Sequence, residues 1–126
     1  MNIILISTIY ITLLFFISGF DKITNFIQVV KEFTNRTKLP FTLSKIIIIG
    51  VILLEIIAPI IISIYSYNHN PLLYTYTKAS LLGLIIFTVL VTFMYHFPPV
   101  GPNYYSFMSN VSTLGGLLLL YKHFSF

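Results

Sequence analysis

The sequence predicts an all-α membrane protein, a bundle of four transmembrane helices with one interfacial amphipathic helix between spans one and two. Hydrophobic residues make up 57% of the 126 residues and charged residues 8%, against about 25% charged residues in soluble domains. The mean hydropathy is +0.95. Four long apolar segments alternate with short polar connections. We therefore expect a single domain over residues 1–126 in a membrane.

Each predicted span is an apolar segment near the length of about 20 residues that crosses the hydrocarbon core. These segments cover residues 3–20, 46–67, 79–97 and 107–121. The first lacks a basic leading region and a small-residue cleavage site, so we expect a retained span rather than a signal peptide. Gly115 and Gly116 in the last segment predict close packing against a neighbouring helix.

The interfacial helix is predicted over about residues 22–36. Apolar residues recur there at helical spacing while polar residues take the other face, which is typical of a helix lying in the membrane surface. The apolar positions are Ile23, Phe26, Ile27, Val30 and Phe33. Pro40 ends this helix before span two begins.

Charge and cysteine content narrow the classes of function. The net charge of +4 comes from seven basic and three acidic residues, and most basic residues lie between Lys22 and Lys45. This favours lipid headgroups, not nucleic acid, as the charged partner. With no cysteine, any electron chemistry would belong to a partner or a bound cofactor. The three histidines are too widely spaced to predict a metal site.

Glu55 is the most informative residue of the predicted spans. A charged carboxylate at mid-membrane costs at least about 2.5 kcal/mol, so it should face the bundle interior and have a partner. Four antiparallel crossings bring Lys22, His96 and Asn110 to one layer at the membrane side of the first connection, with Glu55 about 13 Å deep. We predict a polar pocket of these four residues, with a water-bridged contact between Lys22 and Glu55.

Pro59 cannot donate a hydrogen bond to the carbonyl of Glu55, which predicts a helix kink beside the pocket. Two interpretations of the pocket stay open. Intramembrane polar groups often only hold helices together, at about 0.6 kcal/mol each. A histidine at a helix end such as His96 is often simply solvated.

The arrangement resembles the DoxX family of small four-span membrane proteins. The similarity rests on FFISGFDKI (Phe15–Ile23), GVILLEIIAPIII (Gly50–Ile62), FMYHF (Phe93–Phe97) and SNVSTLGGLLLL (Ser109–Leu120). Two departures are an amino terminus without basic residues and a Ser109-Asn110 pair where the family has Lys-Asn. The resemblance implies recurrent polar positions at Lys22, Glu55, His96 and Asn110, and an association with oxidative enzymes.

Three functions follow from these features. The first is a redox-associated accessory subunit that binds a quinone-like head group or anchors a peripheral oxidoreductase or another membrane subunit. The alternatives are a non-catalytic scaffold or cargo-binding protein, and a small transporter that would need an oligomer. Whether the protein is an enzyme stays open.

Orientation and source stay open as well. The positive-inside rule places the first connection in the cytoplasm, whereas the resemblance places the termini there. The rich content of Ile, Asn, Lys, Tyr and Phe resembles AT-rich genomes, including those of large DNA viruses, for which the membrane would be the host's.

Overall fold

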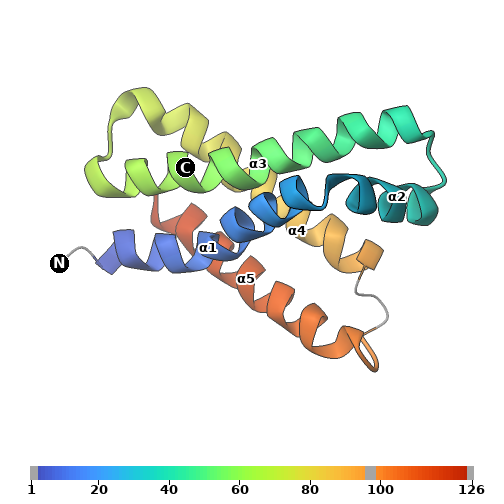
Figure 1. The fold of residues 1–126 in the computed structure, drawn as a ribbon. Helices are drawn as coiled ribbons and strands as arrows, with labels where there is room; N and C mark the ends of the chain where they lie inside the picture. Colours follow the sequence, from blue (N-terminus) through green and yellow to red (C-terminus); the bar gives the residue numbers. More distant parts are fainter. Residues whose placement is uncertain (1–2, 96–98, 125–126) are drawn as a thin grey trace.

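The computed structural model describes residues 3–95 and 99–124 and is all-helical over these ranges. Its elements are α1 (Ile3–Thr24), α2 (Phe26–Thr37), α3 (Phe41–Asn68), the short 3-10 helix η1 (Pro71–Leu73), α4 (Tyr74–Tyr95) and α5 (Asn103–His123). Successive long helices run in opposite directions, with α2 and the α2–α3 connection at one end of the molecule, on the right in Figure 1. The start of α1 and the end of α5 lie toward the opposite end.

Three stretches of helix are long and apolar enough to cross a membrane, namely Ile3–Thr24, Phe41–Asn68 and Pro71–Tyr95. The chain is therefore a multi-pass integral membrane protein. Helix α5 has 21 residues and so has the length of a span, but its first two turns, NYYSFMSN, are too polar for it to join that group.

The helices extend beyond the predicted apolar segments. Helix α1 continues past Phe20 to Thr24, and α3 begins at Phe41 instead of Ile46. Hydropathy marks where a helix leaves the hydrocarbon, whereas backbone hydrogen bonding continues through the polar residues that follow. Only Asn25 separates α1 from α2, and its N–H still donates to the carbonyl of Asp21 at 3.0 Å.

Helix α2 packs on the first half of α3. Val30 and Phe33 are buried against Ile48 and Ile52 of α3, whereas Ile27 on the same helix is half-exposed. The predicted apolar face is thus divided between a protein contact and an outward surface. The helix ends at Thr37, and the next residue, Lys38, caps it: Lys38 has a left-handed φ of 62° and its N–H donates to the carbonyl of Thr34.

The core between the long helices is apolar, and α1 makes its most extensive contact with α3. The buried residues of this core are Phe15, Ala58, Ile62, Tyr65, Leu81, Leu84, Leu117, Leu120 and Phe124.

Four buried threonines donate their hydroxyls to carbonyls four residues earlier at 2.6 to 2.7 Å; they are Thr8, Thr12, Thr88 and Thr92. Small side chains that satisfy themselves in this way let membrane helices pack closely.

The two glycines of α5 differ in their surroundings. A Cβ on Gly116 would lie 3.2 Å from Cγ1 of Ile11, so this glycine permits a close approach of α5 to α1. A Cβ on Gly115 would meet no described atom within 4 Å. Helix α3 continues through Pro59 as one helix, and a bend at that position remains a prediction.

Candidate functional site

Lys22 and Glu55 form a direct ion pair between α1 and α3. The distance from Nζ of Lys22 to Oε1 of Glu55 is 2.7 Å, and the two side chains are 22% and 2% exposed. Lys22 Nζ also donates to Oγ of Ser18 at 2.7 Å. The expected water-bridged contact is therefore wrong for these two residues, because they meet directly.

The direct contact follows from the direction of side chains on helices. Each Cα–Cβ bond tilts toward the N-terminus of its own helix. Lys22 lies in the last turn of α1, so its side chain points back along the span, toward the membrane interior. Helix α3 runs in the opposite direction, so Glu55 points back toward the level of Lys22. The difference in depth between the two backbones is thereby closed.

Gly19 lets the two helices come together at this point. A Cβ on Gly19 would lie 2.7 Å from Cγ1 of Ile56 and 3.3 Å from Cβ of Glu55. Cβ atoms essentially never lie at the first of these distances, so a larger residue would force the side chain of Ile56, or α3 itself, to shift. The glycine therefore helps to hold Glu55 within reach of Lys22.

A cavity of about 260 Å³ lies beside the ion pair. Its polar lining consists of Ser18, Lys22, Glu55, Thr88 and Asn110, and its apolar lining of Leu14, Phe15, Phe87 and Val91. The rings of Phe15 and Phe87 are 6.5 Å apart between centroids, with planes at 59°. A few convergent polar groups in an otherwise apolar hollow are typical of small-molecule sites.

A second cavity of about 340 Å³ adjoins the first on the side of α2. The two share Ser18, Lys22, Phe87 and Val91. Residues found only in the second include Asp21, Asn25, Glu32 and Tyr95. Lys22 thus stands between a membrane-level cavity and one that extends toward the charged end of the molecule.

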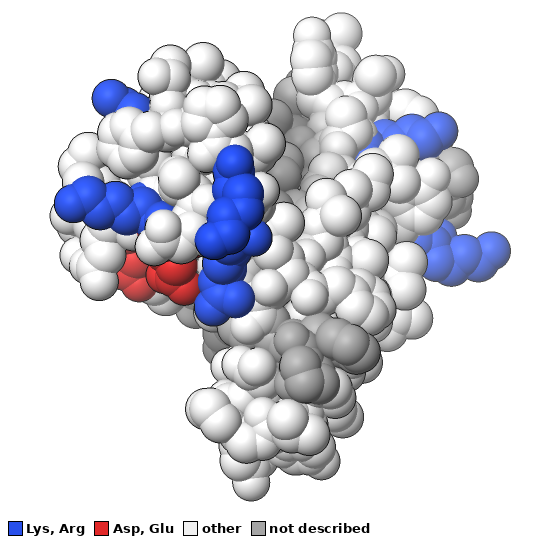
Figure 2. All heavy atoms as spheres, turned by 90° about the vertical axis from the view of Figure 1, so that its right-hand side faces the viewer, with Lys and Arg blue, Asp and Glu red and all other residues white. Residues whose placement is uncertain are grey.

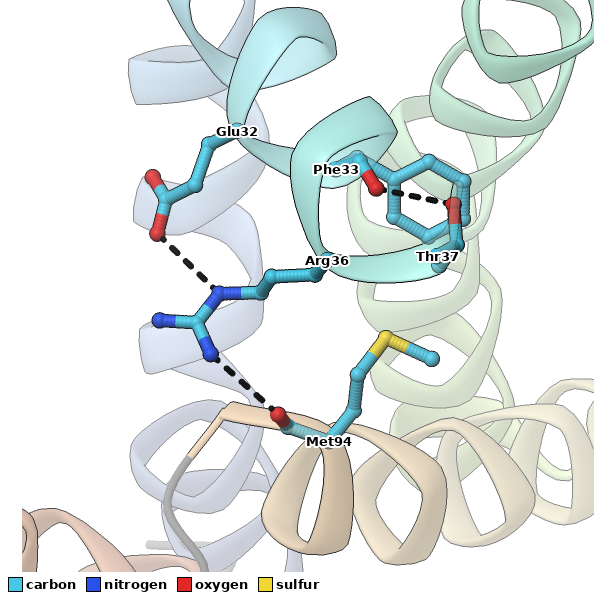
Figure 3. A network of polar contacts seen from close by, with 5 residues as sticks. All are labelled: Glu32, Phe33, Arg36, Thr37 and Met94. Atoms are coloured by element: carbon cyan, nitrogen blue, oxygen red, sulfur yellow. Dashed lines mark hydrogen bonds and ion pairs between the residues drawn. The ribbon is translucent and has the colours of Figure 1, made fainter. Parts of the chain in front are cut away.

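Arg36 connects α2 to the end of α4. It donates from Nη1 to the carbonyl of Met94 at 3.4 Å and lies 3.5 Å from Glu32 (Figure 3). Its guanidinium is 4.4 Å from the ring centroid of Tyr95. The last carbonyls of a helix have no partner within the helix, so Arg36 supplies both a donor and a favourable charge to α4.

The end of the molecule formed by α2 carries many of its charges. Figure 2 looks at this end and shows most of the visible basic and acidic side chains gathered on one lobe. Lys31, Arg36 and Glu32 are exposed residues of α2. Because Arg36 is already engaged within the chain, it is less available to a partner than its exposure suggests.

Three of the four residues predicted to form the pocket line one cavity, namely Lys22, Glu55 and Asn110. The fourth, His96, lies outside the described residues. Ser18, Gly19 and Thr88 were not predicted as part of the site. For Ser18 and Gly19 a signal was present, since they are two small adjacent residues in a span of large apolar ones. Among the described residues, no group of three or more His, Asp or Glu could hold a metal ion.

A family model described as methylamine utilisation protein MauE matches residues 1–102. This range includes Lys22 and Glu55 and ends before α5 begins. The match overturns the resemblance to the DoxX family, which rested on motifs of common apolar residues. No curated protein and no solved structure matches the chain.

Proposed function

Because the chain belongs to the MauE family of methylamine utilisation proteins and holds a largely buried ion pair beside a cavity, we propose that it is a redox-associated membrane accessory protein. We propose further that the cavity binds a quinone-like head group. The observation that carries the proposal is the Lys22–Glu55 pair at the wall of that cavity. The chain has no cysteine, so thiol chemistry in such a system would belong to a partner.

The donors and walls of the cavity suit a flat, carbonyl-bearing ring. The ammonium of Lys22 can donate to a carbonyl oxygen, and the amide of Asn110 provides a second donor on the opposite helix. Glu55 holds Lys22 in position, since an ammonium without a partner at this depth would be costly. Phe15 and Phe87 offer apolar faces to the ring.

The proposal includes a membrane arrangement of four spans in one domain. Helix α5 is about 32 Å long at helical rise, which is enough to cross a hydrocarbon core of about 30 Å. Its second half contributes Leu117 and Leu120 to the shared core, as expected for a span that belongs to the bundle. Helix α2 then lies at the membrane surface, with the exposed Ile27 toward lipid and the exposed Gln28 and Glu32 toward water.

The test is quinone binding by the purified protein in lipid nanodiscs. Radiolabelled decylubiquinone should bind the wild type, and Lys22→Gln should weaken binding by about tenfold or more, because a hydrogen bond from a charged donor contributes about 1.5–3 kcal/mol. The matched control is Lys31→Gln, which removes an exposed lysine that lines neither cavity.

Infrared spectroscopy separates a direct contact from a structural effect. The carbonyl stretch of 13C-labelled quinone should move to lower frequency in the wild type and return toward its free value in Lys22→Gln, at quinone concentrations that saturate both proteins. Equal affinity and an equal carbonyl frequency in the two proteins would exclude Lys22 as the donor. Absence of binding to the wild type would refute the proposed function.

A further inference from the structure

Helices α1 and α5 touch near the middle of α1 and separate toward the start of α5. Ile11 and Gly116 mark the contact, where a Cβ on the glycine would lie only 3.2 Å from Cγ1 of Ile11. From there the first half of α5 diverges from α1 (Figure 1). Asn110 lies about 9 Å along the helix from Gly116. The two helices therefore form a wedge-shaped gap that widens toward the start of α5.

This gap contains a cavity that adjoins the cavity beside the ion pair. It has a volume of about 330 Å³ and is lined by Leu14, Tyr105, Ser106, Ser109 and Asn110. Leu14 and Asn110 also line the cavity beside the ion pair. Leu14 is 50% exposed and Tyr105 82% exposed, so the gap also reaches the outer surface of the bundle.

The lining of the gap is polar on the side of α5. Ser106, Ser109 and Asn110 place two hydroxyls and one amide along the passage. A polar head group that leaves water or the headgroup layer is costly to bury without hydrogen-bond partners, and these groups offset that cost along the whole way. Leu14 on the facing helix provides apolar surface for a hydrocarbon chain.

The cavity on the side of α2 leads to the charged end of the molecule. Its lining is largely apolar, but it also includes Asp21, Lys22 and Glu32, and hydrocarbon in contact with these three groups would strip their hydration without replacing it. Among the described residues that line the gap between α1 and α5, none is charged. The gap is therefore the better route for a ligand with a polar head and an apolar tail.

We propose that the ligand is a membrane-borne amphiphile that enters sideways through the gap between α1 and α5, with its head group passing Ser109 and Asn110 and its tail remaining in the bilayer beside Leu14. The identity of the head group as quinone-like rests on the proposed function. The lateral entry and the tail rest on the geometry of the gap.

A reversible lock across the gap tests this route. Because the chain has no cysteine, the pair Leu14→Cys and Ser109→Cys can be joined selectively by a short bifunctional methanethiosulfonate and released by reductant. The control pair is Ile11→Cys and Gly116→Cys, which joins the helices where they already touch. Association of radiolabelled decylubiquinone with the protein in nanodiscs is followed by scintillation proximity.

Locking the Leu14 and Ser109 positions should slow association by about tenfold or more, as expected when entry requires α1 and α5 to move relative to each other and the crosslink prevents that movement. Reductant should restore the rate in the same sample, which shows that the variant is folded. The control lock should change the rate by less than about twofold. An unchanged rate in the locked gap would overturn lateral entry. Failure of the unlocked protein to bind would instead count against the quinone-like head group.

Discussion

Replacing Glu55 with glutamine removes the negative charge and leaves the ammonium of Lys22 in the bundle without its partner. The native contact is 2.7 Å long, and the carboxylate side chain is only 2% exposed. We expect Glu55→Gln to destabilise the folded protein, and we expect most of that loss to depend on the presence of Lys22.

The magnitude follows from the burial of the two partners. Breaking a fully buried ion pair costs about 3–5 kcal/mol. Lys22 is 22% exposed and retains Ser18 as an acceptor, so part of its charge stays solvated and we expect a loss of about 2–3 kcal/mol. The double variant Lys22→Met with Glu55→Leu should recover to within about 1 kcal/mol of wild type, because an apolar pair has no charge to desolvate.

A double-mutant cycle measures this coupling. Reversible unfolding in mixed micelles with increasing dodecyl sulfate is followed by far-ultraviolet circular dichroism. It gives the free energy of unfolding for the wild type, Lys22→Met, Glu55→Leu and the double variant, which form the cycle, and for Glu55→Gln beside them. Lys31→Met controls for the loss of a basic residue that makes no ion pair within the described chain. Free-energy changes that add to within about 0.5 kcal/mol would show that the two side chains do not interact.

Two further substitutions test the packing around the site. Gly19→Ala should cost about 1–3 kcal/mol in free energy of unfolding, because its Cβ would lie 2.7 Å from Ile56. The control is Gly50→Ala, where a Cβ meets no described atom within 4 Å; it should be neutral or stabilising by up to about 1 kcal/mol in the same assay. Equal losses in the two variants would contradict the close contact at Gly19. Arg36→Gln should raise the rate of amide hydrogen exchange in the last turn of α4 about fivefold, which corresponds to a loss of about 1 kcal/mol in the free energy of local opening. Lys31→Gln should leave this rate unchanged. The same rate in both variants would mean that Arg36 does not stabilise the end of α4.

The helical class and the order of the elements could be predicted because they depend on signals local in the sequence. Apolar runs located α1, α3 and α4, and the spacing of Val30 and Phe33 located α2. The polarity of the first turns of α5 concealed its length, since hydropathy reports the apolar part of a helix and not the helix itself. The structure shows that α5 begins at Asn103, four residues before the start predicted at Phe107.

The contact between Lys22 and Glu55 was within reach of the sequence, but its directness was not. Depth along the membrane could be estimated from helical rise, which separates the two backbones. The opposite tilts of the side chains on antiparallel helices close that separation, and this depends on how near α1 and α3 lie. That distance is set by Gly19, whose importance becomes visible only when Ile56 is placed against it.

The apolar part of helix α3 covers about residues 46–67, which is about 33 Å at helical rise and close to the hydrocarbon thickness of about 30 Å; the ends of the helix (Phe41–Asn68) extend into the headgroups. In a thinner bilayer the apolar part would be too long, and such a mismatch is relieved by tilting of the helix. Since α3 carries the carboxylate and contacts α1, α2 and α4, this tilting would act on the contact between Glu55 and Lys22. Acyl-chain length is thus a variable to which this site is mechanically coupled.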